Sequence, residues 1–351
     1  MPENQQPLVV AVTGLNAIDS PGPGVAVIRA IRDGIKDRPV KIIGLSYETL
    51  EPGIYMHDLV DKTYQIPYPA AGLEALMLRL KFIHGKEQIN VIIPNFDAEL
   101  YNFIKLGPTL RSMGIETFLP TLEQFEARDK MNLYRFGQQY NLLVPKDKII
   151  YNVNELYTCA ESFGYPLVVK GKFYDAIIAH TMEQAQKAFY KLSAKWGFPI
   201  IVQQFITGTE INIAVLGDGT GNATSIIPMR KLYITDKGKA WAGITLEDET
   251  LLQIARTFVQ ATSWKGGCEL EIMRTPDGKP YIMEVNPRFP AWIYLTAGAG
   301  QNQPAALVRM ALGEAVTPYS EYEVGKIFIR YSWDHITDVS EFQKISAFGE
   351  L

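Results

Sequence analysis

The longest apolar runs in this chain of 351 residues are only the length of a strand, which limits what it can fold into. The run at residues 8–12 has five apolar residues in succession, whereas a membrane-spanning helix needs about 20. We therefore expect no membrane span and no membrane partner. In the first third of the chain such runs alternate with helix-like stretches, which is typical of a parallel sheet with crossover helices. The expected strands are residues 8–12, 40–45, 61–66, 91–94 and 117–119, and the expected helices are 25–33, 70–84 and 98–113.

The pattern changes after residue 120. Strands separated by helices continue to residue 203, and neighbouring strands joined by tight turns follow, with turns at residues 217–219 and 276–278. The predicted fold class is α/β with three domains. A parallel α/β domain spans residues 1–120, a small α+β domain spans 121–203, and an α+β domain with an antiparallel sheet spans 204–351.

The composition excludes several classes of protein. The 34 Lys and Arg against 38 Asp and Glu give a net charge of -4, which argues against a nucleic-acid partner. Two cysteines are too few for a disulfide framework, so we expect a reducing compartment. The N-terminal residues lack the features of a signal peptide, and the four histidines are not spaced as metal ligands. We therefore expect a cytoplasmic protein.

Acidic residues gather on a predicted hairpin between residues 268 and 286. Glu284 and Asn286 are two apart in a strand and share a face. The turn at residues 277–278 brings Glu269 or Glu271 opposite them. Two carboxylates and an amide oxygen on one face would suit Mg²⁺, but the spacing alone is equally consistent with solvated acids. Arg288, just beyond, is placed to bind an anionic substrate or a transferred phosphoryl group.

The segment Glu271…Glu284-Val285-Asn286-Pro287-Arg288 resembles the magnesium signature of the ATP-grasp superfamily of carboxylate–amine (or thiol) ligases. It is most similar to the carbamoyl-phosphate-synthetase and biotin-carboxylase branch. Further segments resemble that branch in the same order, namely residues 93–99, 127–131, 165–170 and 203–210. The resemblance implies an ATP-grasp fold, in which the small domain is a lid, with ATP and Mg²⁺ as cofactors. It also implies that Glu271, Glu284 and Asn286 bind the metal.

The resemblance assigns further roles. Lys130 and Lys170 would neutralise the phosphates of ATP, and Lys231 and Arg288 would act on the γ-phosphate and the substrate. For the lysines, a solvated surface position is the alternative. A hinge would bind adenine and ribose through four residues: Gln203, Phe205, Ile206 and Glu210. Phe205 alone could equally be a core aromatic residue.

Two features depart from the family pattern. Where relatives carry a glycine-rich phosphate loop, residues 171–180 contain one glycine, which puts backbone binding of phosphates in doubt; Lys172 is the candidate substitute charge. Gln203 stands where relatives often carry an acid. The cation-rich segment 228–243 contains Tyr233 and Trp241 and is interpreted either as a site for an acidic acceptor or as a surface hairpin.

The sequence thus predicts an ATP- and Mg²⁺-dependent ligase that forms a C–N bond, or joins another nucleophile, through an acyl phosphate. Its partners would be small-molecule or peptide carboxylate and amine substrates, with an amino acid or peptide favoured and a homodimer as one expected state. The alternative is a nucleotide-binding pseudoenzyme or peptide-binding module. A bicarbonate-using carboxylase ranks lower.

Overall fold

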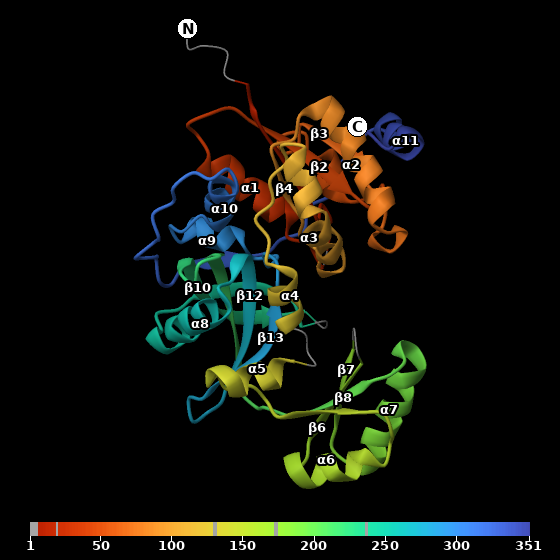
Figure 1. The fold of residues 1–351 in the computed structure, drawn as a ribbon, viewed down its shortest axis with the longest axis vertical. Helices are drawn as coiled ribbons and strands as arrows, with labels where there is room; N and C mark the ends of the chain where they lie inside the picture. Colours follow the sequence, from red (N-terminus) through yellow and green to blue (C-terminus); the bar gives the residue numbers. More distant parts are fainter. Residues whose placement is uncertain (1–5, 19, 129–131, 172–174, 236–237) are drawn as a thin grey trace. The chain divides into compact units, whose positions relative to one another are not determined.

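The structure, a computed structural model, describes residues 6–18, 20–128, 132–171, 175–235 and 238–351. The chain forms two compact units (Figure 1). Unit 1 comprises the described residues of Met1–Phe125, Asn212–Glu269 and Asn286–Leu351, and unit 2 those of Glu126–Ile211 and Leu270–Val285. The division into three domains after residues 120 and 203 stays a prediction.

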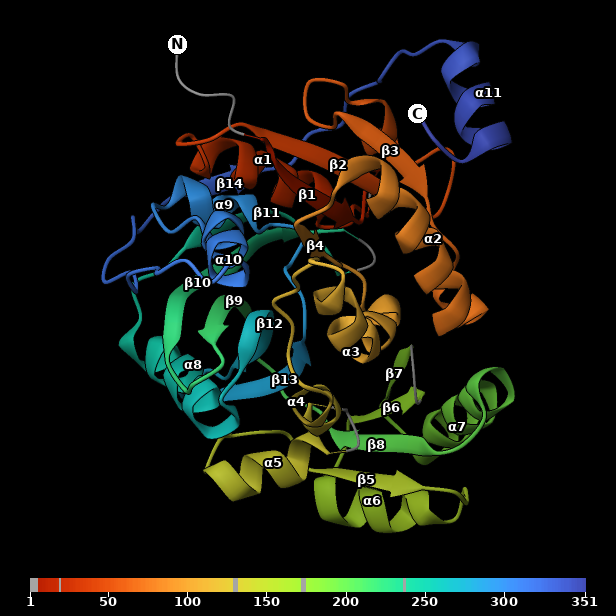
Figure 2. The ribbon, with the colours of Figure 1, turned by 45° about the horizontal axis from the view of Figure 1, so that its top comes forward.

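Unit 1 contains a parallel sheet in the order β3-β2-β1-β4. Its strands are β1 (Leu8–Thr13), β2 (Val40–Ser46), β3 (Lys62–Gln65) and β4 (Val91–Ile93). The associated helices are α1 (Gly24–Gly34), α2 (Leu73–Glu87) and α3 (Asp97–Ser112), with short 3-10 helices η1 (Pro52–Tyr55) and η2 (Pro69–Ala71). One face of the sheet packs against α1 and the other against α2 and α3 (Figure 2). Every residue of β1 is buried because both faces are covered, which explains its continuous apolar run.

The strand predicted at residues 117–119 is wrong. The only pairing there is an isolated bridge between Glu116 and Val91. Phe118 instead packs into the core that α1 covers, so burial of an aromatic side chain accounts for the apolar character of this short run.

The second sheet has the order β13-β12-β9-β10-β11-β14. Its strands are β9 (Thr209–Asp218), β10 (Ala223–Ile234), β11 (Ala240–Thr245), β12 (Lys265–Arg274), β13 (Pro280–Asn286) and β14 (Ile327–Ile329). In unit 1, β10 pairs antiparallel with β11, and β11 with β14. The helices of this part of unit 1 are α8 (Glu249–Thr262) on β10, and α9 (Tyr294–Gly298) and α10 (Gln303–Ala311) on α1. Both predicted turns are confirmed, and Gly219 and Gly278 take the positive φ angles of +86° and +85° that such turns favour.

Unit 2 contains an antiparallel sheet in the order β5-β8-β6-β7. Its strands are β5 (Asp147–Ile150), β6 (Leu167–Gly171), β7 (Ala176–Ala179) and β8 (Ile200–Gln204). One face packs on α6 (Glu155–Phe163) and α7 (Met182–Trp196) around a core that includes Leu167, Val169 and Val202. Two further helices, α4 (Leu122–Ala127) and α5 (Leu133–Tyr140), precede this sheet in the sequence. Unit 1 and unit 2 together confirm the predicted α/β class, with one parallel sheet and antiparallel sheets.

The last residues of the chain cover the outer edge of the parallel sheet. After α11 (Val339–Phe348), the backbone of Leu351 exchanges hydrogen bonds of 2.8 and 2.9 Å with Thr63 of β3, and Gln65 donates to Gly349 at 2.9 Å. Arg79 of α2 also donates to the Gly349 carbonyl at 2.6 Å. The edge strand β3 therefore has hydrogen-bonding partners on both sides. Within the described ranges, no helix is long and apolar enough to cross a membrane.

Candidate functional site

A buried carboxylate on β12 organises the polar residues of unit 1 near the predicted metal site. Glu269 is 5% exposed. Its Oε1 accepts hydrogen bonds from Asn212 Nδ2 at 2.6 Å and Trp292 Nε1 at 2.7 Å, and its Oε2 accepts one from Asn286 Nδ2 at 3.1 Å. Because a carboxylate accepts and an amide nitrogen donates, Glu269 fixes the Asn286 amide with its nitrogen inward. The orientation of this predicted metal ligand therefore depends on Glu269.

Arg288, predicted to be catalytic, lies between two carboxylates. Its Nε donates to Asp97 Oδ2 at 2.8 Å, and its Nη1 lies 3.9 Å from Glu269 Oε2. Nη1 also donates to the Phe289 carbonyl at 3.2 Å. The side chain is 15% exposed. The guanidinium is thus held firmly, and nearby acids offset much of its charge.

The first turn of α3, which carries Asp97, is anchored by a second buried acid. Glu99 is fully buried and accepts hydrogen bonds from the backbone nitrogens of Asn95 at 2.7 Å and Phe96 at 2.9 Å. Thr13 Oγ1 donates to it at 2.5 Å, and Tyr47 also donates its hydroxyl. Burial raises the pKa of Glu99. These bonds tie the carboxyl ends of β1 and β4 to α3 and thereby position the partner of Arg288.

The two predicted carboxylate ligands lie on adjacent strands of unit 2. Glu271 is on β12 and Glu284 on β13, and both are partly buried. The turn between the strands is closed by hydrogen bonds between Thr275 and Lys279, with Thr275 N donating to the Lys279 carbonyl at 3.0 Å. The predicted hairpin is confirmed, and the metal-binding role stays a prediction. Among the described residues no group of three or more His, Cys, Asp or Glu could hold a metal ion; the predicted set combines two carboxylates with an amide.

Lys231, the second predicted catalytic residue, lies on β10 opposite Gly243 of β11. Its Nζ donates to the Gly238 carbonyl at 3.3 Å, so the side chain is held along the hairpin. Tyr233 and Trp241 stack with ring centroids 5.0 Å apart. The pairing of β10 with β11 makes this segment a hairpin, and the stacking explains how Trp241 is partly shielded at 38% exposed.

One face of the small sheet in unit 2 gathers polar residues from three strands. In the pairing of β5, β8 and β6, Asp147 lies opposite Gln203, and Gln203 lies opposite Val168. Lys170 is two residues from Val168 and shares its face. Burial raises the pKa of Asp147 to about 6, and the charge of Lys170 acts against this rise. Lys170 and the predicted adenine-binding residue Gln203 therefore share one face with Asp147, an acid that no sequence motif indicated.

Two acceptor atoms on this face have no donor among the described residues. They are Gln203 Oε1 and Asp147 Oδ2, and both are buried. A buried acceptor without a donor costs free energy unless a ligand or water supplies one. This face of the sheet therefore suits a ligand that brings hydrogen-bond donors.

The remaining predicted hinge residues follow β8 in unit 2. Ile206 is buried at 7% exposure, and Phe205 and Glu210 are partly buried. Lys130 and Lys172 lie outside the described residues. For all of these residues, binding of a nucleotide stays a prediction.

Three important residues were missed because they become neighbours only through the fold. Asp97 and Asn212 come from α3 and β9, and Asp147 opens β5. The sequence indicates Glu269 only as an alternative to Glu271. The available signal was a polar residue inside an apolar strand, as in the segment 211–215 that contains Asn212.

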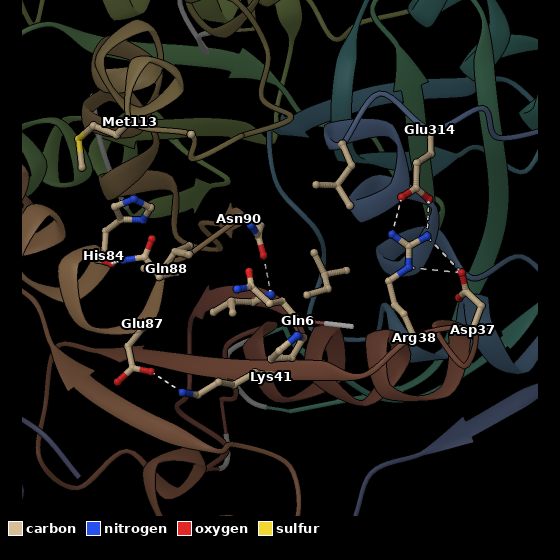
Figure 3. Close-up of a pocket in the computed structure, with 16 residues that line it drawn as sticks. Gln6, Asp37, Arg38, Lys41, His84, Glu87, Gln88, Asn90, Met113 and Glu314 are labelled. Atoms are coloured by element: carbon tan, nitrogen blue, oxygen red, sulfur yellow. Dashed lines mark hydrogen bonds and ion pairs between the residues drawn. The ribbon is translucent and has the colours of Figure 1, made fainter. Parts of the chain in front are cut away.

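A cavity of about 1300 Å³ in unit 1 is lined by none of the predicted site residues (Figure 3). It is at the amino ends of β1 and β2, lined by Leu8 and Lys41 among others. Its cations are paired, Lys41 with Glu87 at 2.5 Å and Arg38 with Glu314 at 2.6 Å. Ligands of open parallel sheets bind at the carboxyl ends of the strands, so we do not assign this cavity to the candidate site.

Comparison with known proteins identifies relatives. Residues 198–332 match the sequence model of a family described as ATP-grasp in the biosynthetic pathway with Ter operon. The chain is 27% identical over 177 residues to a D-alanine--D-alanine ligase of Cupriavidus metallidurans, covering 46% of this chain and 54% of that protein. It is 24% identical over 260 residues to the carbamoyl phosphate synthase large chain of Clostridium perfringens, covering 66% of this chain and 23% of that one. The chain therefore spans about half or less of the length of these curated relatives.

The fold is also that of a solved structure. The biotin carboxylase domain of Hydrogenobacter thermophilus 2-oxoglutarate carboxylase superposes with a TM-score of 0.70 at 18% identity, covering 90% of this chain and 72% of that one. That domain was solved as a dimer with MgADP, ADP and bicarbonate. The family match, the relatives and the fold confirm the predicted resemblance to the ATP-grasp superfamily and to its carbamoyl-phosphate-synthetase and biotin-carboxylase branch.

Proposed function

We propose that this chain is an ATP- and Mg²⁺-dependent ligase that joins a carboxylate substrate to an amine or another nucleophile, with an amino acid or peptide as the carboxylate. The observation that carries the proposal is the Glu269 cluster. It holds both Asn286 and Arg288 of the Glu-Val-Asn-Pro-Arg segment in unit 1. A solvated hairpin would not need a buried carboxylate with three donors.

The residues present fit the nucleotide and its metal. Glu271, Glu284 and the oxygen of Asn286 would hold Mg²⁺, which prefers carboxylate and amide oxygens and fills its other positions with phosphates and water. When bound, the metal would neutralise charge that develops during phosphoryl transfer. The buried acceptors of Gln203 and Asp147 fit the amino group of adenine or the hydroxyls of ribose, both of which donate. Phe205, Ile206 and Glu210 would complete this site, with Lys130 and Lys172 as further phosphate contacts.

The proposed reaction has two balanced steps. A substrate carboxylate oxygen attacks the γ-phosphorus, the bond to the bridging oxygen breaks, and ADP and an acyl phosphate result. The amine then attacks the acyl carbon and loses a proton, and inorganic phosphate leaves. In this scheme Lys170 offsets phosphate charge, Lys231 contacts the transferred phosphoryl group, and Arg288, fixed by Asp97, orients the acceptor.

A screen of ADP release tests this proposal. Amino acids and short peptides, D-alanine among them, would be supplied singly and in pairs with ATP and Mg²⁺. Glu284→Gln is expected to lower the rate at least about a hundredfold with little change in the thermal unfolding midpoint, because it removes a charge from the metal site. Asp277→Asn, on the exposed turn of the same hairpin, is the matched control and should keep the rate. Full turnover by Glu284→Gln would contradict the metal assignment.

A nucleotide-binding module without turnover is the second candidate, and the connection between β6 and β7 favours it. Only residues 172–175 separate the two strands. Asp175 is anchored to α7 by Lys195 Nζ at 2.7 Å and Trp196 Nε1 at 2.9 Å. Such a short connection has little length to cover phosphates. Tight ATP binding in calorimetry without ADP release for any substrate pair would support this candidate.

A bicarbonate-using carboxylase is the third candidate, since one structural relative was solved with bicarbonate. It requires bicarbonate to stimulate ADP release. We also propose a homodimer, as in that relative, and a cytoplasmic location. Light scattering and fractionation of cells would test these two proposals.

A further inference from the structure

Arg330, directly after β14, lies on the same face of the large sheet as Lys231. Lys231 pairs with Gly243, and Gly243 pairs with Phe328, so these residues form one row across three strands. Arg330 is two residues from Phe328 and shares its face. Its guanidinium carbon lies 5.8 Å from the centre of the Phe328 ring.

The Arg330 side chain also contacts the loop that follows Arg288. Its Nη2 donates to the Ala291 carbonyl at 3.1 Å, and its backbone nitrogen donates to the Trp241 carbonyl at 2.7 Å. Trp292, next to Ala291, donates to Glu269. Arg330 therefore contacts the residue that precedes Trp292, and Trp292 binds the same carboxylate, Glu269, that holds Asn286.

Arg330 differs from Arg288 in its charge environment. No carboxylate lies within ion-pair distance of Arg330 in the part of the chain that the structure describes, and burial lowers its pKa. Arg288 is paired with Asp97 at 2.8 Å, and Arg309 with Asp37 at 2.6 Å. A partly buried guanidinium without an acid costs free energy in the free protein. An anion that binds there would recover this energy, and a planar fork of donors fits two oxygens of one oxyanion.

We propose that Arg330 supplies the unmatched positive charge that anchors the carboxylate group of the substrate, and that Arg288, already paired with Asp97, helps to orient it. The identification of this anion as the substrate rests on the proposed ligase function. The binding of an oxyanion at Arg330 is independent of that function. The proposed occupant is a carboxylate, and a phosphate group, which has the same oxyanion chemistry, is the alternative that the test distinguishes.

The test measures thermal unfolding of the whole chain without ATP, so it does not depend on turnover. Acetate and inorganic phosphate are titrated separately, at constant ionic strength set with chloride. We expect acetate to raise the unfolding midpoint of the wild-type chain, whether or not phosphate does so too. Arg330→Gln should lose this increase while its midpoint without anion stays equal or rises, because an unmatched charge is gone. Arg330→Lys should recover part of the response.

Arg79→Gln is the matched control, because Arg79 also donates to backbone carbonyls, those of Gln65 and Gly349. It should unfold at a lower temperature and keep the whole anion response. A response to acetate that Arg330→Gln loses supports a carboxylate subsite, whether or not phosphate also binds, and a response to phosphate alone overturns the carboxylate assignment. The proposal is also overturned if the wild-type chain shows no response, or if Arg330→Gln keeps it. If the ligase screen finds a substrate, Arg330→Gln should raise its KM at least about tenfold with a smaller change in kcat.

Discussion

Replacing Glu269 by Gln tests how Asn286 is held. The carboxylate faces three donors, two on Oε1 and one on Oε2. The oxygen of a Gln amide can take the place of Oε1, and its NH₂ group then faces Asn286 Nδ2. Two donors face each other, so the Asn286 amide should rotate and accept the new hydrogen bond with its oxygen. Its nitrogen would then occupy the position proposed for a metal-binding oxygen.

The expected loss of stability is modest. A hydrogen bond to a charged group is worth about 1.5–3 kcal/mol and a neutral one about 1 kcal/mol, so Glu269→Gln should lower the free energy of unfolding by about 1–2 kcal/mol. Glu269→Ala leaves all three donors without an acceptor in a buried site and should lower it by about 3–5 kcal/mol. Denaturation with urea measures both values.

The effect on metal use should be larger. Changes to residues that orient a metal ligand typically weaken metal affinity by about 10–100-fold. In the ADP-release assay, the Mg²⁺ concentration for half-maximal rate should therefore rise by at least about tenfold in Glu269→Gln. If the screen finds no substrate, a calorimetric titration of Mg²⁺ with ATP present serves as the readout.

A second substitution separates the effect on the orientation of the Asn286 side chain from a general loss of stability. In Glu269→Gln combined with Asn286→Asp, the new carboxylate accepts from the new amide and directs its other oxygen toward the metal position. We expect the double variant to recover much of the Mg²⁺ dependence, with a coupling energy of the kind that contacting residues show. The reasoning is refuted if Glu269→Gln loses stability but uses Mg²⁺ as the wild type does.

Two other predictions concern stability. Burial raises the pKa of Asp147 from 3.8 to about 6, against the opposing charge of Lys170, so the folded state binds the proton more tightly and stability falls as the pH rises from about 4 through 6. Asp147→Asn should therefore stabilise the chain by ~1–2 kcal/mol at pH 8, after allowance for solvent screening, and by little at pH 4. An equal gain at the two pH values would contradict this prediction. In Gly24→Ala a Cβ would lie 2.2 Å from the Thr13 carbonyl oxygen, so urea denaturation should show a loss of about 2–3 kcal/mol. Gly85→Ala, in α2 with nothing within 4 Å of the new Cβ, should instead gain about 0.5–1 kcal/mol. A loss there would show that steric overlap of the Cβ is not what separates the two sites.

The parts of the fold that could be predicted from sequence are those set by local periodicity. The run at residues 8–12 indicated a strand buried on both faces, and β1 is fully buried. The turn at Asp277 and Gly278 indicated the hairpin of β12 and β13, because glycine readily takes the positive φ that the turn has. The run at residues 117–119 misled the prediction because a buried loop and a short strand have the same apolar signature.

The candidate site was predictable only where its residues are close in sequence. Glu284 and Asn286 share a face because they are two apart in a strand. Asn212 and Asp97, which bind Glu269 and Arg288, come from other elements, and no spacing in the sequence indicates these contacts. Asp147 meets the face of Lys170 and Gln203 only through strand pairing. The tertiary contacts of these charged residues therefore cannot be predicted from one sequence.

The pairing of residues 349–351 with β3 has a consequence for the order in which the chain can fold. Thr63 is synthesised early, and its outer backbone partner is the last residue. The core around α1 likewise includes residues of α10. Unit 1 therefore has many contacts between distant parts of the sequence, a property that slows folding. During synthesis the first 125 residues leave an open strand edge and an incomplete core until the C-terminal segment has emerged, and in that interval we expect them to depend most on chaperones.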